Sequence, residues 1–233
     1  MMLDESKMEN ILKFLKDNAD ETYAQFMQKL IPTIEKDRII GVRTDKLRKF
    51  AKKNKDLSKE FLNNLPHSFF EENQIHVFYL NEIKDFDILI RETERFLPYI
   101  DNWATCDALR PKIFKSHLNR LLPLIKKWIK SEKPYTQRFA IGMLYKYFTD
   151  ENFDEDKIKL AMCAKSNNYY VKMMKAWFLS EVAVNHFDCV YKYLKENIDD
   201  REIFQMTVQK IYDSRRIAKE NKEKLKEYKK NII

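Results

Sequence analysis

Apolar residues recur every three or four positions along most of the chain, which is the spacing of one face of an α-helix. Residues 4–18 form the first such stretch, with Ile11 and Leu15 on one face. A second helix is predicted over 21–30, and its inward positions are Tyr23, Phe26, Met27 and Leu30. The pattern breaks at 31–38, because Pro32 disfavours helix at the residue before it.

The helical pattern resumes after Gly41, which supplies the freedom for a turn. Thr44 is the predicted N-cap of the next helix, which turns Leu47 inward and a set of lysines and arginines outward. From residue 57 onward short polar breaks separate further helices. Their predicted ranges are 57–64, 69–83, 86–97, 102–116, 118–130, 135–148, 154–165, 168–184, 187–196, 199–210 and 214–230.

The helices recur in pairs at intervals of roughly 35–40 residues, a spacing typical of HEAT and armadillo arrays. The chain of 233 residues contains only 2 glycines and 6 prolines, whereas sheet proteins of this length need many turn glycines. We therefore predict an all-α fold, a right-handed α-solenoid of HEAT-like helix pairs in a single domain over 1–233. A compact helical bundle is the alternative.

The formal net charge of +8 favours a polyanionic partner, because a basic surface attracts nucleic acid or an acidic membrane face. Part of this excess is concentrated in 43–53 and 210–230. A lysine-rich surface that serves only solubility is the simpler explanation. No apolar run is long enough to cross a bilayer, so we expect no membrane association.

The 3 cysteines are far apart and odd in number, which argues against a disulfide framework and favours a reducing cytoplasm. Glu72 and His76 are helical neighbours, but further ligands with useful spacing are missing, so we expect a hydrogen-bonded helix contact there and no metal. The sequence also lacks a glycine-rich phosphate loop and a catalytic triad pattern, and we expect no cofactor.

Four residues are candidates for a site. Trp103 and Asp107 are four positions apart, so in a helix an indole and a carboxylate share one face. Arg138 and Trp177 would join them if their helices stack side by side. The alternative is that the tryptophans are core residues and that Asp107 is a helix-dipole partner or a cap.

Six segments carry a resemblance to a known family. They are GVRTDKLR at 41–48, EENQIH at 71–76, DNWATCD at 101–107, QRFAI at 137–141, VKMMKAW at 171–177 and QKI at 209–211. In this order the chain resembles the DNA alkylation repair family of HEAT-like-repeat DNA glycosylases, the AlkD-like proteins. That resemblance implies a concave basic surface that cradles duplex DNA and the metal-free removal of cationic N3- and N7-alkylated purines.

The resemblance also implies roles for the four candidates. Asp107 would be the catalytic carboxylate that stabilises the oxocarbenium-like sugar, and Trp103 and Trp177 would be aromatic walls beside the damaged nucleotide. Arg138 would hold the DNA near the lesion. Further phosphate contacts are expected from the basic runs, at Arg43, Lys46, Lys172, Arg215 and Arg216. We expect a monomer that binds alkylated duplex DNA.

Segment 31–38 departs from the family pattern, because active members carry a short basic and aromatic helix there that reaches into the minor groove. This chain has Ile31-Pro32-Thr33-Ile34-Glu35-Lys36-Asp37-Arg38 at that place, which is poor in helix signals. Two other functions therefore remain open. One is a non-catalytic helical-repeat module that binds nucleic acid, and the other is a protein–protein scaffold.

Overall fold

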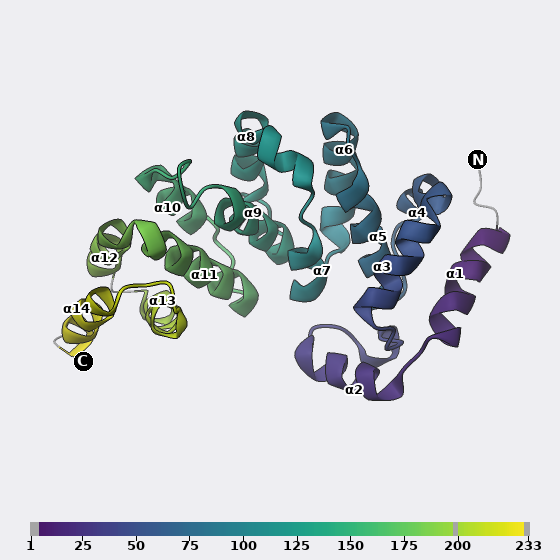
Figure 1. Cartoon of the computed structure of the whole chain (residues 1–233), viewed down its shortest axis with the longest axis horizontal. Helices are drawn as coiled ribbons and strands as arrows, with labels where there is room; N and C mark the ends of the chain where they lie inside the picture. Colours follow the sequence, from purple (N-terminus) through teal and green to yellow (C-terminus); the bar gives the residue numbers. More distant parts are fainter. Residues whose placement is uncertain (1–4, 198–199, 231–233) are drawn as a thin grey trace. The chain divides into compact units, whose positions relative to one another are not determined.

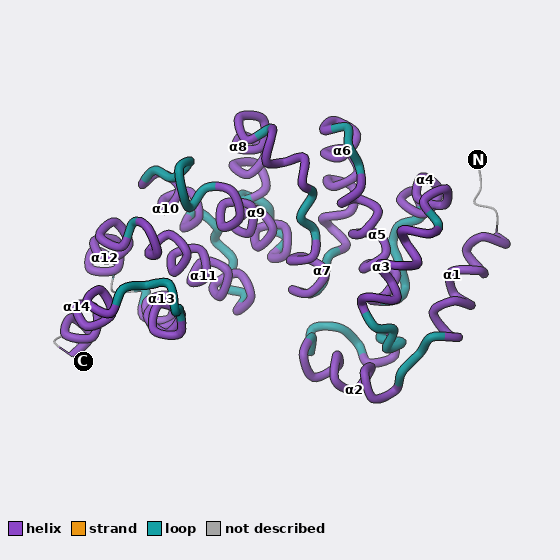
Figure 2. The backbone as a smooth tube through the Cα atoms, in the orientation of Figure 1, coloured by secondary structure: helices purple, strands orange, loops and turns teal. Residues whose placement is uncertain are grey.

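All the regular structure in the described part of the chain, residues 5–197 and 200–230, is helical (Figures 1 and 2). The structure is a computed structural model of the whole chain. This confirms the all-α prediction. The first residues of the predicted helices 4–18 and 199–210 lie outside the described residues. The chain divides into two compact units, Met1–His117 and Leu118–Ile233, each with its own core.

The first unit contains seven of the α-helices in the described residues, and also four short 3₁₀ turns. The helices are α1 (Glu5–Asp17), α2 (Glu21–Leu30), α3 (Thr44–Lys53), α4 (Ser58–Asn63), α5 (Phe70–Glu82), α6 (Phe86–Phe96) and α7 (Trp103–Ala108). The turns are η1 (Lys36–Arg38), η2 (Lys55–Leu57), η3 (Leu97–Tyr99) and η4 (Lys112–Ser116).

Helix α5 is the centre of the first unit and packs against α3, α4, α6 and α7. Every residue from Phe70 to Leu80 is buried, including polar ones, so their hydrogen bonds have to be satisfied inside the protein. Glu71 accepts the backbone N–H groups of Ile40, Gly41 and Val42. Glu71 of the EENQIH motif therefore fixes the turn at the start of the GVRTDKLR motif. Both motifs thus have a structural role in the first unit.

Gly41 is needed in that turn for two reasons. Its φ is +94°, a backbone conformation that residues with a Cβ rarely adopt. A Cβ at this position would also lie 2.3 Å from the carbonyl oxygen of Asp20 and 2.8 Å from Cβ of Ala24. The close approach of α2 to the turn therefore depends on the missing side chain.

The second unit is built from helix pairs. Its helices are α8 (Leu118–Trp128), α9 (Pro134–Tyr147), α10 (Glu155–Met162), α11 (Tyr169–Asn185), α12 (Phe187–Glu196), α13 (Arg201–Asp213) and α14 (Lys219–Lys230). Helices α9, α11 and α13 pack in a row, and α8, α10, α12 and α14 each pack against a member of that row. This is the arrangement of helical repeats. A continuous right-handed solenoid in one domain over 1–233 stays a prediction.

Three local predictions were wrong. The predicted helix 102–116 is a short α7 followed by a turn and the 3₁₀ helix η4, because Pro111 cannot donate a backbone hydrogen bond. Thr44 is the first helical residue of α3, and Arg43 before it has the extended conformation of an N-cap. On α2, Phe26 and Leu30 are 55% and 40% exposed, so that face does not turn fully inward.

Candidate functional site

Helix α7 of the first unit displays Trp103 and Asp107 one turn apart, as the sequence predicted, and both residues are partly exposed. The start of the helix is held by buried Asn102, whose side chain accepts the backbone N–H of Thr105 at 2.8 Å. Gln74 of α5 donates to the Thr105 hydroxyl at 2.9 Å. These bonds orient α7 on the central helix, and they explain Gln74 in its motif.

The end of α7 is fixed by Asn81 of α5. Its side-chain amide donates to the carbonyl oxygen of Ala108 at 2.9 Å, and its oxygen accepts the backbone N–H of Arg110 at 2.8 Å. Both ends of α7 are therefore tied to α5. A helix this short gains its rigidity from such contacts rather than from its own propensity.

Trp103 is positioned by the N-terminal part of the unit. Its indole N–H donates to the carbonyl oxygen of Leu30 at 3.0 Å. Its ring packs against the apolar cluster of Ala24, Met27, Ile31, Ile34, Ile39 and Phe70. One edge of the Trp103 ring is therefore in contact with protein. Another part of the side chain is exposed.

Segment 31–38 docks on the residue that precedes α7's cap. Arg38 pairs with Asp101 at 2.8 Å and also donates to the carbonyl oxygen of Ser68. The Thr33 hydroxyl donates to the backbone oxygen of Asp101 at 2.9 Å. The segment contains only one 3₁₀ turn, Lys36–Arg38, and it supports the Trp103 helix.

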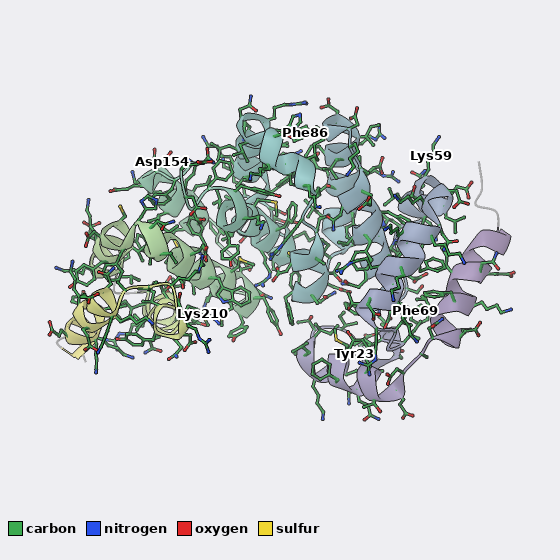
Figure 3. All side chains as sticks on the ribbon, in the orientation of Figure 1. Tyr23, Lys59, Phe69, Phe86, Asp154 and Lys210 are labelled. Atoms are coloured by element: carbon green, nitrogen blue, oxygen red, sulfur yellow. The ribbon has the colours of Figure 1, made fainter. Side chains whose placement is uncertain are left out.

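In the second unit, two cations neighbour the ring of Trp177 on α11. The Arg138 guanidinium of α9 is 5.6 Å from the indole centroid, and the Lys210 ammonium of α13 is 4.9 Å from it. Figure 3 labels Lys210 on α13. Arg138 is only 1% exposed and donates to the backbone oxygen of Tyr170. Three adjacent helices therefore each contribute one residue to this group.

The other predicted phosphate contacts differ in their surroundings. Arg43 pairs with Asp20 at 2.8 Å and lies over the Tyr23 ring, labelled in Figure 3. Lys172 pairs with Glu202, and Arg216 pairs with Glu181. Lys46 and Arg215 are exposed.

Sequence reasoning assigned no role to Lys210, although the QKI motif contained it. The missing information was the packing of α13 against α11, which brings the ammonium to the Trp177 ring. The hydrogen-bonded helix contact expected at Glu72 and His76 is a contact with the segment just before their own helix. Glu72 accepts the backbone N–H groups of Ser68 and Phe69 at the start of its own helix, and His76 is hydrogen-bonded to His67.

No group of three His, Cys, Asp or Glu side chains that could hold a metal ion occurs in residues 5–197 and 200–230. Within the same described ranges, no helix is long and apolar enough to cross a membrane.

The fold and the two groups around Trp103 and Trp177 place the chain in the class of helical-repeat proteins with aromatic and charged side chains on neighbouring helices. The family model described as "DNA alkylation repair enzyme" matches residues 11–229, and the chain belongs to this family. A comparison with curated proteins gave no match. Membership assigns the chain to DNA alkylation repair and identifies DNA as its partner.

Proposed function

We propose that this protein is a DNA glycosylase that hydrolyses the N-glycosidic bond of cationic N3- and N7-alkylated purines in duplex DNA. The observation that carries the proposal is the display of Trp103 and Asp107 one turn apart on α7, in a family of DNA alkylation repair enzymes. Membership in the family supports alkylated DNA as the substrate, and the partly exposed carboxylate supports the hydrolytic chemistry.

The chemistry begins with the substrate, because an alkylated purine already carries the positive charge that makes it a good leaving group. As the base leaves with the electron pair of the glycosidic bond, the positive charge moves to the sugar as an oxocarbenium ion. A fixed carboxylate stabilises that charge and orients the attacking water, as in glycoside hydrolysis. Asp107 has this role in the proposal, and water supplies the hydroxyl group that completes the hydrolysis.

Trp103 and Trp177 each have the role of an apolar surface against the sugar-phosphate backbone of the DNA. The N–H of Trp103 is already engaged by Leu30, which holds the ring in one orientation. Arg138 is buried, so we assign it a positioning role for Trp177 in addition to the predicted DNA contact. Lys46 and Arg215 are exposed and suit direct phosphate contacts, and Arg43, Lys172 and Arg216 would exchange carboxylate partners for phosphates.

A second candidate function is that of a non-catalytic nucleic-acid-binding member of the family. Segment 31–38 favours it, since this segment docks on Asp101 through Thr33 and Arg38 and carries only one 3₁₀ turn. A cytoplasmic location and a monomeric state complete the proposal in both cases.

The test is an excision assay on duplex DNA that contains one N7-methylguanine. Asp107→Asn keeps the shape and removes the charge, so it should slow excision by about 10²–10³-fold. Asp156→Asn is the matched control, because that carboxylate is 81% exposed on α10. Equal rates for Asp107→Asn and the wild type would refute the catalytic role. If the wild type binds the duplex and excises nothing, the non-catalytic function is correct.

A further inference from the structure

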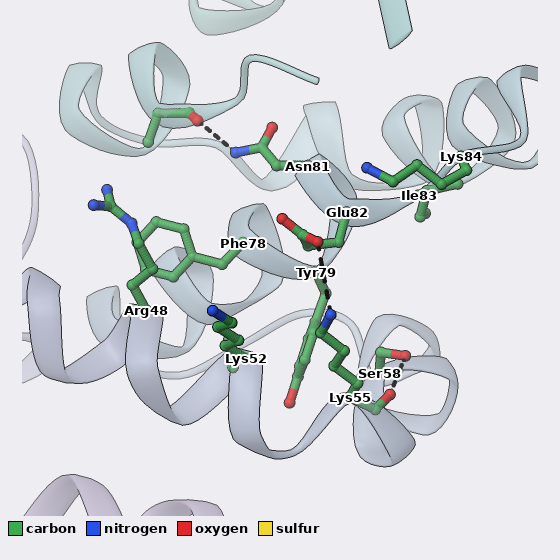
Figure 4. Close-up of a pocket in the computed structure, with 12 residues that line it drawn as sticks. Arg48, Lys52, Lys55, Ser58, Phe78, Tyr79, Asn81, Glu82, Ile83 and Lys84 are labelled. Atoms are coloured by element: carbon green, nitrogen blue, oxygen red, sulfur yellow. Dashed lines mark hydrogen bonds and ion pairs between the residues drawn. The ribbon is translucent and has the colours of Figure 1, made fainter. Parts of the chain in front are cut away.

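The first unit contains an open pocket between α3 and the C-terminal half of α5, with a volume of about 840 Å³ (Figure 4). This volume lies in the range of sites that bind small ligands, roughly 300–1,000 Å³. The lining also includes Ala108, the last residue of α7, and Asn81, which ties α7 to α5. The pocket therefore borders the helix that carries Asp107.

The charge of the lining is strongly positive. Its cations are Arg48, Lys52, Lys55 and Lys84, and its only carboxylate belongs to Glu82. Glu82 is matched by Lys55 at 3.8 Å. In the described part of the chain, no ion pair links Arg48, Lys52 or Lys84 to a carboxylate. Three of the four lining cations therefore have no ion pair with a carboxylate of the described residues.

The pocket wall is preorganised by aromatic residues. The Arg48 guanidinium lies over the Phe78 ring, 5.1 Å from its centroid, and Figure 4 shows the two side chains against each other. Tyr79 donates to the backbone oxygen of Asn54 at 2.8 Å, and burial raises the pKa of its phenol to about 12. The phenol therefore stays neutral and adds no negative charge to the pocket.

The basic residues of α3 divide between two faces. Arg48 and Lys52 are four positions apart and line the pocket together. Lys49 comes directly after Arg48, and Lys53 comes directly after Lys52. Both lysines are exposed and neither lines the pocket. The basic residues of α3 therefore line the pocket on one face of the helix and form an ordinary solvated surface on the other.

We infer that the α3–α5 pocket is a phosphate-binding site. A phosphate offers several acceptor oxygens and a negative charge to two ammonium groups and a guanidinium fork. Phosphate is favoured over a carboxylate ligand because the chain belongs to a DNA repair family, and in this respect the inference rests on the proposed function. The phosphate comes either from the backbone of a nucleic-acid strand or from a free nucleotide.

The test compares two double variants of equal charge change. Lys52→Ala with Lys84→Ala removes two pocket cations that are exposed and have no ion pair, so the fold should persist. Lys49→Ala with Lys53→Ala removes two cations from the other face of α3. Circular dichroism checks folding, and Lys52→Gln with Lys84→Gln replaces the first variant if alanine unfolds it.

The first measurement is the salt dependence of the affinity for an undamaged DNA duplex. Each neutralised phosphate contributes about 0.9 to the slope of log K against log salt, so the pocket variant should lower the slope by roughly 1 to 2 and the control less. The second measurement is calorimetric titration with deoxyadenosine monophosphate. A loss of nucleotide binding confined to the pocket variant, with duplex binding equal in both variants, identifies a free nucleotide as the ligand.

Equal behaviour of the two double variants in both measurements would overturn the pocket assignment. If the wild type still excises N7-methylguanine in that case, only the pocket inference fails. If nucleotide binding depends on Lys52 and Lys84 while the wild type neither binds nor cleaves alkylated duplex, the proposed glycosylase function fails and the phosphate site stands.

Discussion

The indole nitrogen of Trp103 and the carbonyl oxygen of Leu30 are 3.0 Å apart and joined by a hydrogen bond. Leu30 is the last residue of α2, where backbone carbonyls have no partner inside the helix. Trp103 begins α7, the helix that also carries Asp107. One bond therefore satisfies the end of α2 and fixes the ring of a candidate site residue before any DNA is bound.

Replacing Trp103 by phenylalanine should separate these contributions. Trp103→Phe keeps an aromatic ring in the apolar cluster and removes the hydrogen-bond donor, which should lower the free energy of unfolding by about 0.5–1.5 kcal/mol. Urea denaturation measures this as a lower midpoint with an unchanged slope. A midpoint equal to that of the wild type would mean that water replaces the indole donor at no cost.

The two glycines of the chain should respond to alanine in opposite directions. Gly41→Ala requires φ near +94° and brings a Cβ to 2.3 Å from a backbone oxygen, so it should destabilise the first unit by more than about 1 kcal/mol. Gly142→Ala on α9 meets only Met174 Cε at 3.9 Å and should stabilise the second unit by about 0.5–1 kcal/mol. Thermal denaturation of both variants checks the two signs; a stabilising Gly41→Ala would contradict our account of the turn.

Much of the helical structure could be predicted because the helices follow the periodicity of apolar residues. Trp103 and Asp107 were expected on one helical face, and α7 has them one turn apart. The same periodicity continues past Pro111, where the backbone cannot continue the helix, and so it predicted one long helix over 102–116. Periodicity describes side chains, whereas helix ends depend on backbone hydrogen bonds.

The surroundings of the charged residues could not be predicted. Arg138 and Lys46 are both basic residues in family-like motifs, but the first is buried under α11 and the second is exposed. Glu71 is a buried acceptor for three backbone N–H groups rather than a surface acid. These differences arise from packing between helices that are distant in sequence, which spacing along the chain does not encode.

Acid should destabilise the first unit through two buried histidines. His67 Nε2 and His76 Nδ1 are 2.8 Å apart, and the rings stack on Phe61 and Phe96. Burial lowers the pKa of His67 to about 4 and the pKa of His76 well below its ordinary value of 6.5. The nearby charge of Arg95 also lowers the pKa of His76. Both rings therefore stay neutral in the folded protein at neutral pH.

The direction in which stability changes with pH follows from the protons that each state binds. Below pH 6.5 the unfolded chain binds protons at these histidines and the folded protein does not, so stability falls as the pH decreases toward about 4. The slope is about 1 kcal/mol per pH unit for each histidine. Burial raises the pKa of Glu71 and Glu72. The folded protein therefore binds protons at these two groups before the unfolded chain does, which increases stability as the pH falls.

A double variant isolates the histidines from the two glutamates. His67→Leu with His76→Leu removes both partners of the bond, so no buried polar atom loses its partner. Its unfolding free energy should depend less on pH between pH 6.5 and 4.5 than that of the wild type, as urea titrations at each pH would show. A wild-type slope in the double variant would assign the acid sensitivity to other groups.

The last prediction concerns Lys210, whose ammonium lies 4.9 Å from the centroid of the Trp177 ring. With Arg138 at 5.6 Å, two protein cations already neighbour the ring, so we expect Trp177 to adjoin the anionic backbone of DNA rather than the cationic base. Lys210→Gln should lower the slope of log K against log salt by about 1. It should weaken binding to damaged and undamaged duplexes equally, because phosphate contacts carry no base information. Lys126→Gln, an exposed lysine on α8, is the control and should leave both affinities nearly unchanged. A loss confined to the N7-methylguanine duplex would instead mean that Lys210 acts at the lesion, and the backbone assignment of Trp177 would have to be abandoned.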